Sequence, residues 1–277
     1  MIVKNQPNFK SFEEKVKWLV DNEEELIIAA KSTIKYADAI VCSPEVDYMN
    51  FSYKDTNSNN YTYKASQDTD TELKRTVLIN TTKIFDSHED VHFDGLWNKS
   101  VKENKNIKFL QEHQMKFDKV IAQKEDLKAY VKEFSWKDLG YDFEGKTEAL
   151  TFDATIKSDV NNFMFNQYKN NNVDNHSVGM QYIKIKLAIN SDDPDYAAYK
   201  DTWDKYYPEI ANKADVDRSG IFWAVLEAKV IEGSAVLVGS NQFTPTLSRD
   251  KHLDKDETEV SRKEALTKGI MNFLKNN

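Results

Sequence analysis

The longest strand pattern in the chain is HSVGMQYIKIKLAIN, residues 176–190. Its side chains alternate in character over a long span, and a period of two places successive side chains on opposite faces of a strand. We therefore predict one long strand here. Since a strand must pair with others, we expect further strands around this segment, in the central and later parts of the chain.

The sequence on both sides of this segment supports a β-rich core with helices between the strands. Four further segments combine β-branched and apolar residues in runs typical of strands: RTVLINTTKIF (75–85), NIKFLQEHQ (106–114), ALTFDATIK (149–157) and FWAVLEAKVIEGSAVLVGS (222–240), which gives one or two strands. A helix is predicted over residues 158–171, with Ser158 as a candidate cap. The fold class is α+β.

Helical patterns mark both ends of the chain. Ser11 and Glu14 have the spacing of a capping box, and Asp21 is a second candidate start. We divide the chain into a helical N-terminal extension with a polar linker (residues 1–70), a core (71–248) and a C-terminal amphipathic helix (249–277). Residues 192–220 look like an insertion into the core, helical or loop-like in pattern.

Composition narrows the classes of function. The net charge of −8 does not suit a general nucleic-acid binder, which needs a basic face. No apolar run is long enough to span a membrane, and the first 20 residues lack the apolar core of a signal peptide. A single cysteine, Cys42, cannot form an internal disulfide, so nothing indicates an oxidising compartment. We expect a cytoplasmic protein without a cofactor, or one that works inside an assembly made in the cytoplasm.

One short motif suggests a zinc peptidase. Residues 88–92 read HEDVH, and in a helix His88 and His92 would hold zinc while Glu89 acted as a general base, with Glu112 as a further ligand. The flanking sequence is a strand pattern before the motif and a turn-like Asp-Gly pair after it. We therefore expect a loop, and the zinc peptidase remains only an alternative.

A second set of residues supplies the three roles of serine hydrolysis. His113 follows a strand that looks buried, Ser177 begins the longest strand, and Glu232 lies in the last strand. A serine hydroxyl is a poor nucleophile until an imidazole accepts its proton, and an acid orients that imidazole. Taken singly, each residue also has an ordinary structural interpretation. His176 should point away from any site that Ser177 faces, because neighbouring strand residues face opposite ways.

The segments IKFLQEHQ, HSVGMQYIKIKLAI and AKVIEGSAVLVGSNQFTP, in this order, resemble the prohead (capsid maturation) serine proteases of tailed bacteriophages, distant relatives of the herpesvirus assemblins. DSHEDVHFDGLWNKSVKEN resembles the family's early strand-loop segment. The resemblance covers about residues 75–245 and implies a barrel-like, assemblin-type core. It implies Ser177 as nucleophile, His113 as general base and Glu232 as the third member, with Asp118 and Glu227 as weaker candidates.

The resemblance also implies a biological setting. The expected enzyme cleaves scaffold protein, or the scaffolding segment of the major capsid protein, inside the immature capsid (prohead) in the host cytoplasm, and cleaves itself. If the active form requires self-association and that association is weak, the enzyme stays inactive until capsid assembly concentrates it. Two features differ from or add to the pattern: Gln114 stands where the family commonly has aspartate, and Gly179 could let backbone approach the scissile carbonyl. The alternative is a catalytically inactive structural or scaffold component with the same fold.

Overall fold

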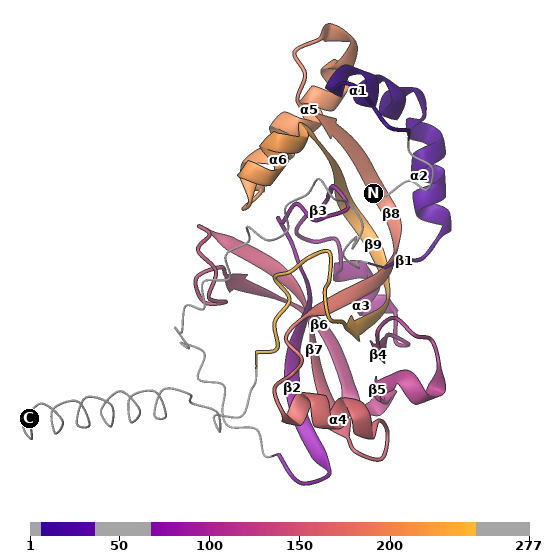
Figure 1. The fold of residues 1–277 in the computed structure, drawn as a ribbon, viewed down its shortest axis with the longest axis vertical. Helices are drawn as coiled ribbons and strands as arrows, with labels where there is room; N and C mark the ends of the chain where they lie inside the picture. Colours follow the sequence, from indigo (N-terminus) through magenta and orange to yellow (C-terminus); the bar gives the residue numbers. More distant parts are fainter. Residues whose placement is uncertain (1–6, 37–67, 248–277) are drawn as a thin grey trace, which may run out of the picture.

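The computed structural model describes residues 7–36 and 68–247 (Figure 1). The predicted polar linker, Cys42 and the C-terminal helix therefore lie outside the described residues. The helices are α1 (Phe12–Asp21), α2 (Glu23–Ser32), α3 (Asn98–Glu103), α4 (Asn162–Lys169), α5 (Ala197–Tyr206) and α6 (Lys213–Ser219). The strands are β1 (Lys35–Tyr36), β2 (Glu72–Thr81), β3 (Asp90–His92), β4 (Lys108–Gln111), β5 (Val120–Ala122), β6 (Leu127–Ser135), β7 (Lys146–Lys157), β8 (His176–Ile189) and β9 (Ile221–Ala235).

The described strands form two sheets. The larger has the order β1-β8-β9-β4-β5, with β3 also paired to β9, and the smaller has the order β2-β7-β6. The predicted α+β class is confirmed. The barrel-like form expected for the core is not, because neither of these sheets closes on itself. In the described residues, only short β3 and β4 pair in parallel with β9; the other pairs are antiparallel.

The antiparallel pair β8–β9 is the longest feature of the fold. The 14 residues of β8 pair with β9 from His176 opposite Ala235 to Ile189 opposite Ile221. Figure 1 shows the two strands running together from the helical end of the molecule to its middle. The predicted long strand is confirmed, and residues 222–235 belong to one strand, not two.

The two sheets pack face to face through aromatic and branched side chains. The ring of Phe109 on β4 meets that of Phe152 on β7 edge to face, with 5.8 Å between their centroids. Gly233 on β9 has no side chain because a Cβ there would lie 2.6 Å from Phe152 and 2.8 Å from Ile79. Close packing of this kind holds β9 against the smaller sheet.

The N-terminal helices are part of the folded unit. Ser11 caps α1, as predicted, by accepting a hydrogen bond from the Glu14 amide, but the Glu14 carboxylate accepts from the Lys10 amide and so does not complete a capping box. The second helix begins after Asn22, one residue later than the predicted start at Asp21. Four apolar side chains of the two helices are buried in the main core: Val16, Leu19, Leu26 and Ala30.

The segment between β8 and β9, predicted to be helical or loop-like, contains helices α5 and α6. Trp203 of α5, Val216 of α6 and Ile210 between them are buried in a second apolar cluster with residues of β9. That this segment is an insertion stays a prediction. Gly220 ends α6 with φ of +69°, a conformation that glycine adopts without strain, and a Cβ there would also clash with Phe12 of α1. The insertion therefore forms the surface on which α1 lies.

Two local expectations need correction. Ser158 does not cap α4; the Asn161 side chain does, by accepting a hydrogen bond from the Met164 amide. Strand β6 was not predicted, because its burial is irregular and no clean alternation marks it. In the described part of the chain, no helix has the length and apolar character needed to cross a membrane.

Candidate functional site

The HEDVH segment does not form a zinc-binding helix. Its first residues form a turn in which Glu89 has φ of +59°, and residues from Asp90 to His92 form β3. The Glu89 carboxylate pairs with Lys15 of α1 at 2.6 Å and accepts a hydrogen bond from Ser219 at 2.8 Å. The helical zinc mechanism is therefore wrong for this motif, and Glu89 instead connects α1 with the end of the insertion.

The two histidines of the motif also differ in surroundings. His92 is buried, its Nδ1 lies 3.1 Å from Asn80 Oδ1, and burial holds the pKa of its imidazole below the ordinary value of 6.5. His88 instead lies beside Asp86 and Asp90, with possible ligand atoms of all three within 4.8 Å of one another. Asp90 also accepts a hydrogen bond from Tyr182. The grouping thus differs from the predicted one of His88, Glu89 and His92.

Ser177, His113 and Glu232, in contrast, lie in one hydrogen-bonded row. His113 Nε2 is 2.8 Å from Ser177 Oγ, and His113 Nδ1 is 2.5 Å from Glu232 Oε1. The two contacts use the two opposite nitrogens of one imidazole. This is the geometry in which a carboxylate orients a histidine and the histidine can accept a hydroxyl proton.

The larger sheet explains how residues far apart in sequence meet. On neighbouring strands, Ser177 of β8 lies opposite Ser234 of β9, and Gly179 lies opposite Glu232. Because strand side chains two residues apart share a face, these four residues lie on the same side of the sheet. Strand β4 runs parallel on the far side of β9 and ends at Gln111, so His113 enters from the turn that follows.

That turn holds His113 in an unusual backbone conformation. Glu112 and His113 have φ of +52° and +54°, values that residues with a Cβ seldom adopt. Two hydrogen bonds fix the turn: the Glu112 amide donates to the Ala235 carbonyl and the Gln114 amide to the Gln111 carbonyl. Such conformations persist where the surroundings determine them, and they concentrate at functional sites.

Gly179 provides the space that Glu232 needs. A Cβ on Gly179 would overlap Glu232 Oε1 and lie 2.9 Å from its Cδ. The glycine therefore lets the carboxylate lie across β8 and reach His113. The approach of a scissile carbonyl to this glycine stays a prediction; the structure shows that the face on which a Cβ would lie is taken by the carboxylate.

Ser234 is a member of the site that the sequence analysis missed. Its hydroxyl donates to Glu232 Oε2 at 2.6 Å and accepts a hydrogen bond from the His113 amide at 3.0 Å. It thus fixes both the second carboxylate oxygen and the backbone of the histidine. The signal was present in the pattern E-x-S, because residues 232 and 234 of one strand share a face.

The other candidates lie elsewhere. The Asp118 side chain is 74% exposed in a short 3-10 turn (Phe117–Lys119), Glu227 pairs with Lys99, and Gln114 bonds to Glu112. His176 faces away from the site as expected, with its ring between the Tyr168 hydroxyl at 2.9 Å and the Thr244 carbonyl at 2.8 Å. Of the predicted acids, Glu232 alone contacts His113 in the described structure.

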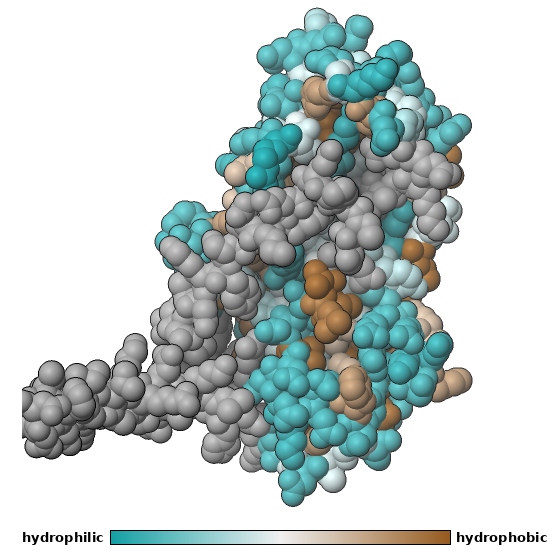
Figure 2. Space-filling model, viewed as in Figure 1, coloured by the Kyte–Doolittle hydropathy of each residue, from teal (hydrophilic) through white to brown (hydrophobic). Residues whose placement is uncertain are grey.

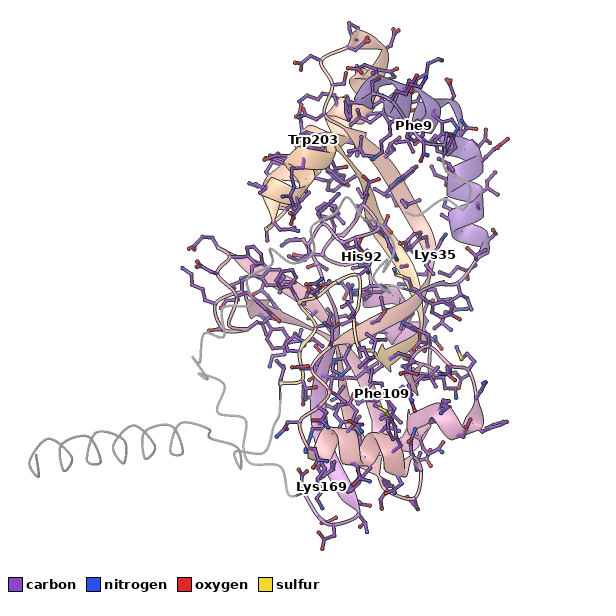
Figure 3. The ribbon with its side chains drawn as sticks, viewed as in Figure 1. Phe9, Lys35, His92, Phe109, Lys169 and Trp203 are labelled. Atoms are coloured by element: carbon purple, nitrogen blue, oxygen red, sulfur yellow. The ribbon has the colours of Figure 1, made fainter. Side chains whose placement is uncertain are left out.

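The site is closely covered. Ser177 is 2% exposed, Glu232 is fully buried and the His113 side chain is 6% exposed. Tyr36 of β1 lies against the imidazole, with 4.7 Å between the two ring centroids. In Figure 3, Lys35, the neighbour of Tyr36 on β1, lies near the middle of the molecule, as does His92 of β3. Trp203 lies toward one end and Lys169 at the other.

The arrangement contains the three groups that acyl transfer by a serine requires. A buried carboxylate with a second hydrogen bond from Ser234 stays fixed, so it can hold one tautomer of His113 and stabilise the imidazolium that forms when Ser177 loses its proton. Comparison of this chain with protein-family models, curated proteins and solved structures finds no match.

Proposed function

We propose that the protein is a serine endopeptidase that uses Ser177, His113 and Glu232. The observation that carries the proposal is the continuous pair of contacts from Ser177 Oγ through both imidazole nitrogens to Glu232. Two further features support it: the room that Gly179 leaves for the carboxylate, and the hydrogen bond from Ser234. Together they hold the carboxylate in the position from which it contacts His113.

The proposed reaction proceeds in two steps. His113 Nε2 accepts the proton as Ser177 Oγ attacks a peptide carbonyl, and the imidazolium then gives that proton to the leaving amine. Water, deprotonated by the same imidazole, releases the acyl group and restores Ser177. Glu232 accepts the hydrogen bond from Nδ1, so that Nε2 faces the hydroxyl.

The proposed setting is capsid maturation. It rests on the resemblance of the segments around His113, Ser177 and Glu232 to phage prohead proteases, and the α+β fold is compatible with it. The proposed substrates are the scaffold protein or the scaffolding segment of the major capsid protein, cleaved inside the prohead in the host cytoplasm, together with self-cleavage. An assemblin-type core is part of this proposal, although the described sheets remain open. Self-association would confine activity to the assembling shell.

A covalent probe tests the chemistry without knowledge of the substrate. A fluorophosphonate reacts with serines that a neighbouring base activates, so wild-type protein should be labelled at Ser177 and Ser177→Ala should not. Ser240→Ala is a matched control, because Ser240 is also buried and hydrogen-bonded but contacts Asp86. Labelling that persists in Ser177→Ala would refute the assignment.

Co-expression tests the setting. With the capsid and scaffold proteins encoded beside it, the wild type should give processed fragments and Ser177→Ala should leave the partners whole. Labelling without processing would keep the peptidase and reject the capsid setting. Absence of both would favour the inactive structural alternative.

A further inference from the structure

The short strand β1 occupies one edge of the strand that carries Ser177. Lys35 pairs with Met180 and Tyr36 with Gly179, in antiparallel register. In the described residues, β8 has no other strand partner on this side, although it is 14 residues long. An open strand edge binds extended peptides through backbone hydrogen bonds. In the described residues, the edge beside the proposed nucleophile therefore has backbone groups with which an extended peptide can pair, and β1 occupies part of it.

The register of β1 relates this edge to the reaction centre. Tyr36 lies opposite Gly179, and an antiparallel strand continued by two residues would lie opposite Ser177. The side chain of Tyr36 lies on the Ser177 face of the sheet, where its ring contacts His113. A bound peptide in the same register would bring a backbone carbonyl close to Ser177, with a side chain over the imidazole.

Several contacts hold β1 at this edge. The Gln181 side chain of β8 donates to the Lys31 carbonyl at the end of α2 at 2.8 Å. Farther back, Tyr199 of the insertion donates to Glu23 at 2.8 Å, and burial and this bond raise the pKa of Tyr199 to about 12. The bond from Gln181 is exposed, and an exposed bond costs little to break, which suits a short edge strand that can leave.

We propose that peptide substrates add to β8 as an antiparallel strand in the place of β1, and that the space over His113 filled by Tyr36 is a subsite for an aromatic or large apolar side chain. The inference rests on the proposed peptidase function. It makes β1 an internal competitor of the substrate. It also predicts a sequence preference for the substrate: an aromatic residue two positions before the residue that lies opposite Ser177.

The surroundings of His113 suit an apolar ligand. The described surface in Figure 2 is mostly hydrophilic, with separate apolar patches. Met115 and Phe117, which follow His113 closely in sequence, are 51% and 100% exposed. Exposed apolar side chains in this segment give the chain near His113 apolar surface that a partner can cover.

Binding can be measured apart from catalysis. The probe is a fluorescein-labelled peptide with the sequence KSTIKYAD, residues 31–38 of this chain, and the protein is the full chain carrying Ser177→Ala. Adding Tyr36→Ala to the protein should free the edge and tighten peptide binding, measured by anisotropy, by about tenfold, which corresponds to about 1.4 kcal/mol. Adding Tyr36→Phe should leave affinity near its original value. A peptide with alanine in place of its tyrosine should bind more weakly than the tyrosine peptide.

A second measurement tells whether Tyr36 competes with the substrate or instead holds His113 in position. In otherwise wild-type protein, Tyr36→Ala should lower KM for a peptide of this pattern with little change in kcat, whereas Phe163→Ala, an exposed aromatic on α4, should change neither. A fall in kcat with KM unchanged would make Tyr36 a support for His113 and overturn the inference, as would unchanged peptide affinity in the binding assay. If wild-type protein shows no labelling at Ser177 but the peptide still binds as expected, the proposed peptidase function is refuted and the proposed peptide site on β8 is not.

Discussion

Replacing Gly179 with alanine should disable the site while leaving most of the fold. The added Cβ would overlap Glu232 Oε1 and lie 2.9 Å from Cδ, whereas ordinary contact begins at 3.4 Å. The carboxylate must therefore move away from the position in which it bonds His113 Nδ1 at 2.5 Å. A displacement of roughly 1 Å in a catalytic group costs about 10²-fold in rate, and complete loss of the orienting acid about 10⁴-fold.

The expected result is a fall of about 10²- to 10⁴-fold in the rate of fluorophosphonate labelling at Ser177, followed by time-resolved mass spectrometry. Glu232 is buried, so its displacement also costs stability. Overpacking of this kind costs typically about 1–3 kcal/mol, which thermal or denaturant unfolding would register.

Gly233→Ala is the matched control. It adds the same methyl group on the adjacent strand, but its Cβ meets Phe152 and Ile79 between the sheets, not the carboxylate. It should destabilise by a similar amount, and its folded fraction should still label. Equal labelling of Gly179→Ala and wild type, at equal folded fraction, would refute the role assigned to Glu232. Equal loss in both glycine variants would show that sheet packing alone explains the effect.

Three further outcomes follow from other contacts. Ser234→Ala removes a donor to Glu232 and an acceptor for the His113 amide, and we expect labelling to slow about 10- to 100-fold, the range for a hydrogen bond to a charged group; unchanged labelling would contradict it. Burial holds the pKa of His92 below 6.5, so the unfolded chain binds the proton more readily than the folded one, and protonation favours unfolding as pH falls below about 6.5. Denaturant titrations should show the free energy of unfolding decreasing below about pH 6.5, by at most about 1.4 kcal/mol per pH unit from this group. His92→Gln should flatten that slope. Glu89→Ala should lower the melting temperature more than Lys15→Ala, because Glu89 also contacts the end of α6, while labelling persists; loss of labelling would instead restore a catalytic role to Glu89.

The sequence predicted those parts of the fold that have clear local patterns. The alternation in residues 176–190 indicated β8, although burial alternates only in part of the strand: the residues at both of its ends are buried on both faces. The same reasoning correctly directed His176 away from the face that carries Ser177. The HEDVH motif was correctly rejected as a helix from its flanks.

Other features depend on contacts between distant segments, which local patterns do not record. Tyr36 reaches His113 only because α1 and α2 fold back over β8, and 119 residues separate His113 from Glu232. The open form of the two sheets depends on how the nine strands in the described residues pair, and alternation alone does not determine this pairing. The cap at Asn161 in place of Ser158 shows how an error of one turn arises when several residues of one segment can serve as caps.

The order of synthesis has a consequence for when chemistry can begin. His113 and Ser177 leave the ribosome before Glu232, which lies near the end of β9, the last strand described. Glu232 can reach His113 only after β9 has inserted between β8 and β4, since its neighbours on both sides belong to those strands. A nascent chain therefore lacks the contact between His113 and Glu232 until β9 is in register, and the hydrogen-bonded row is completed together with the larger sheet.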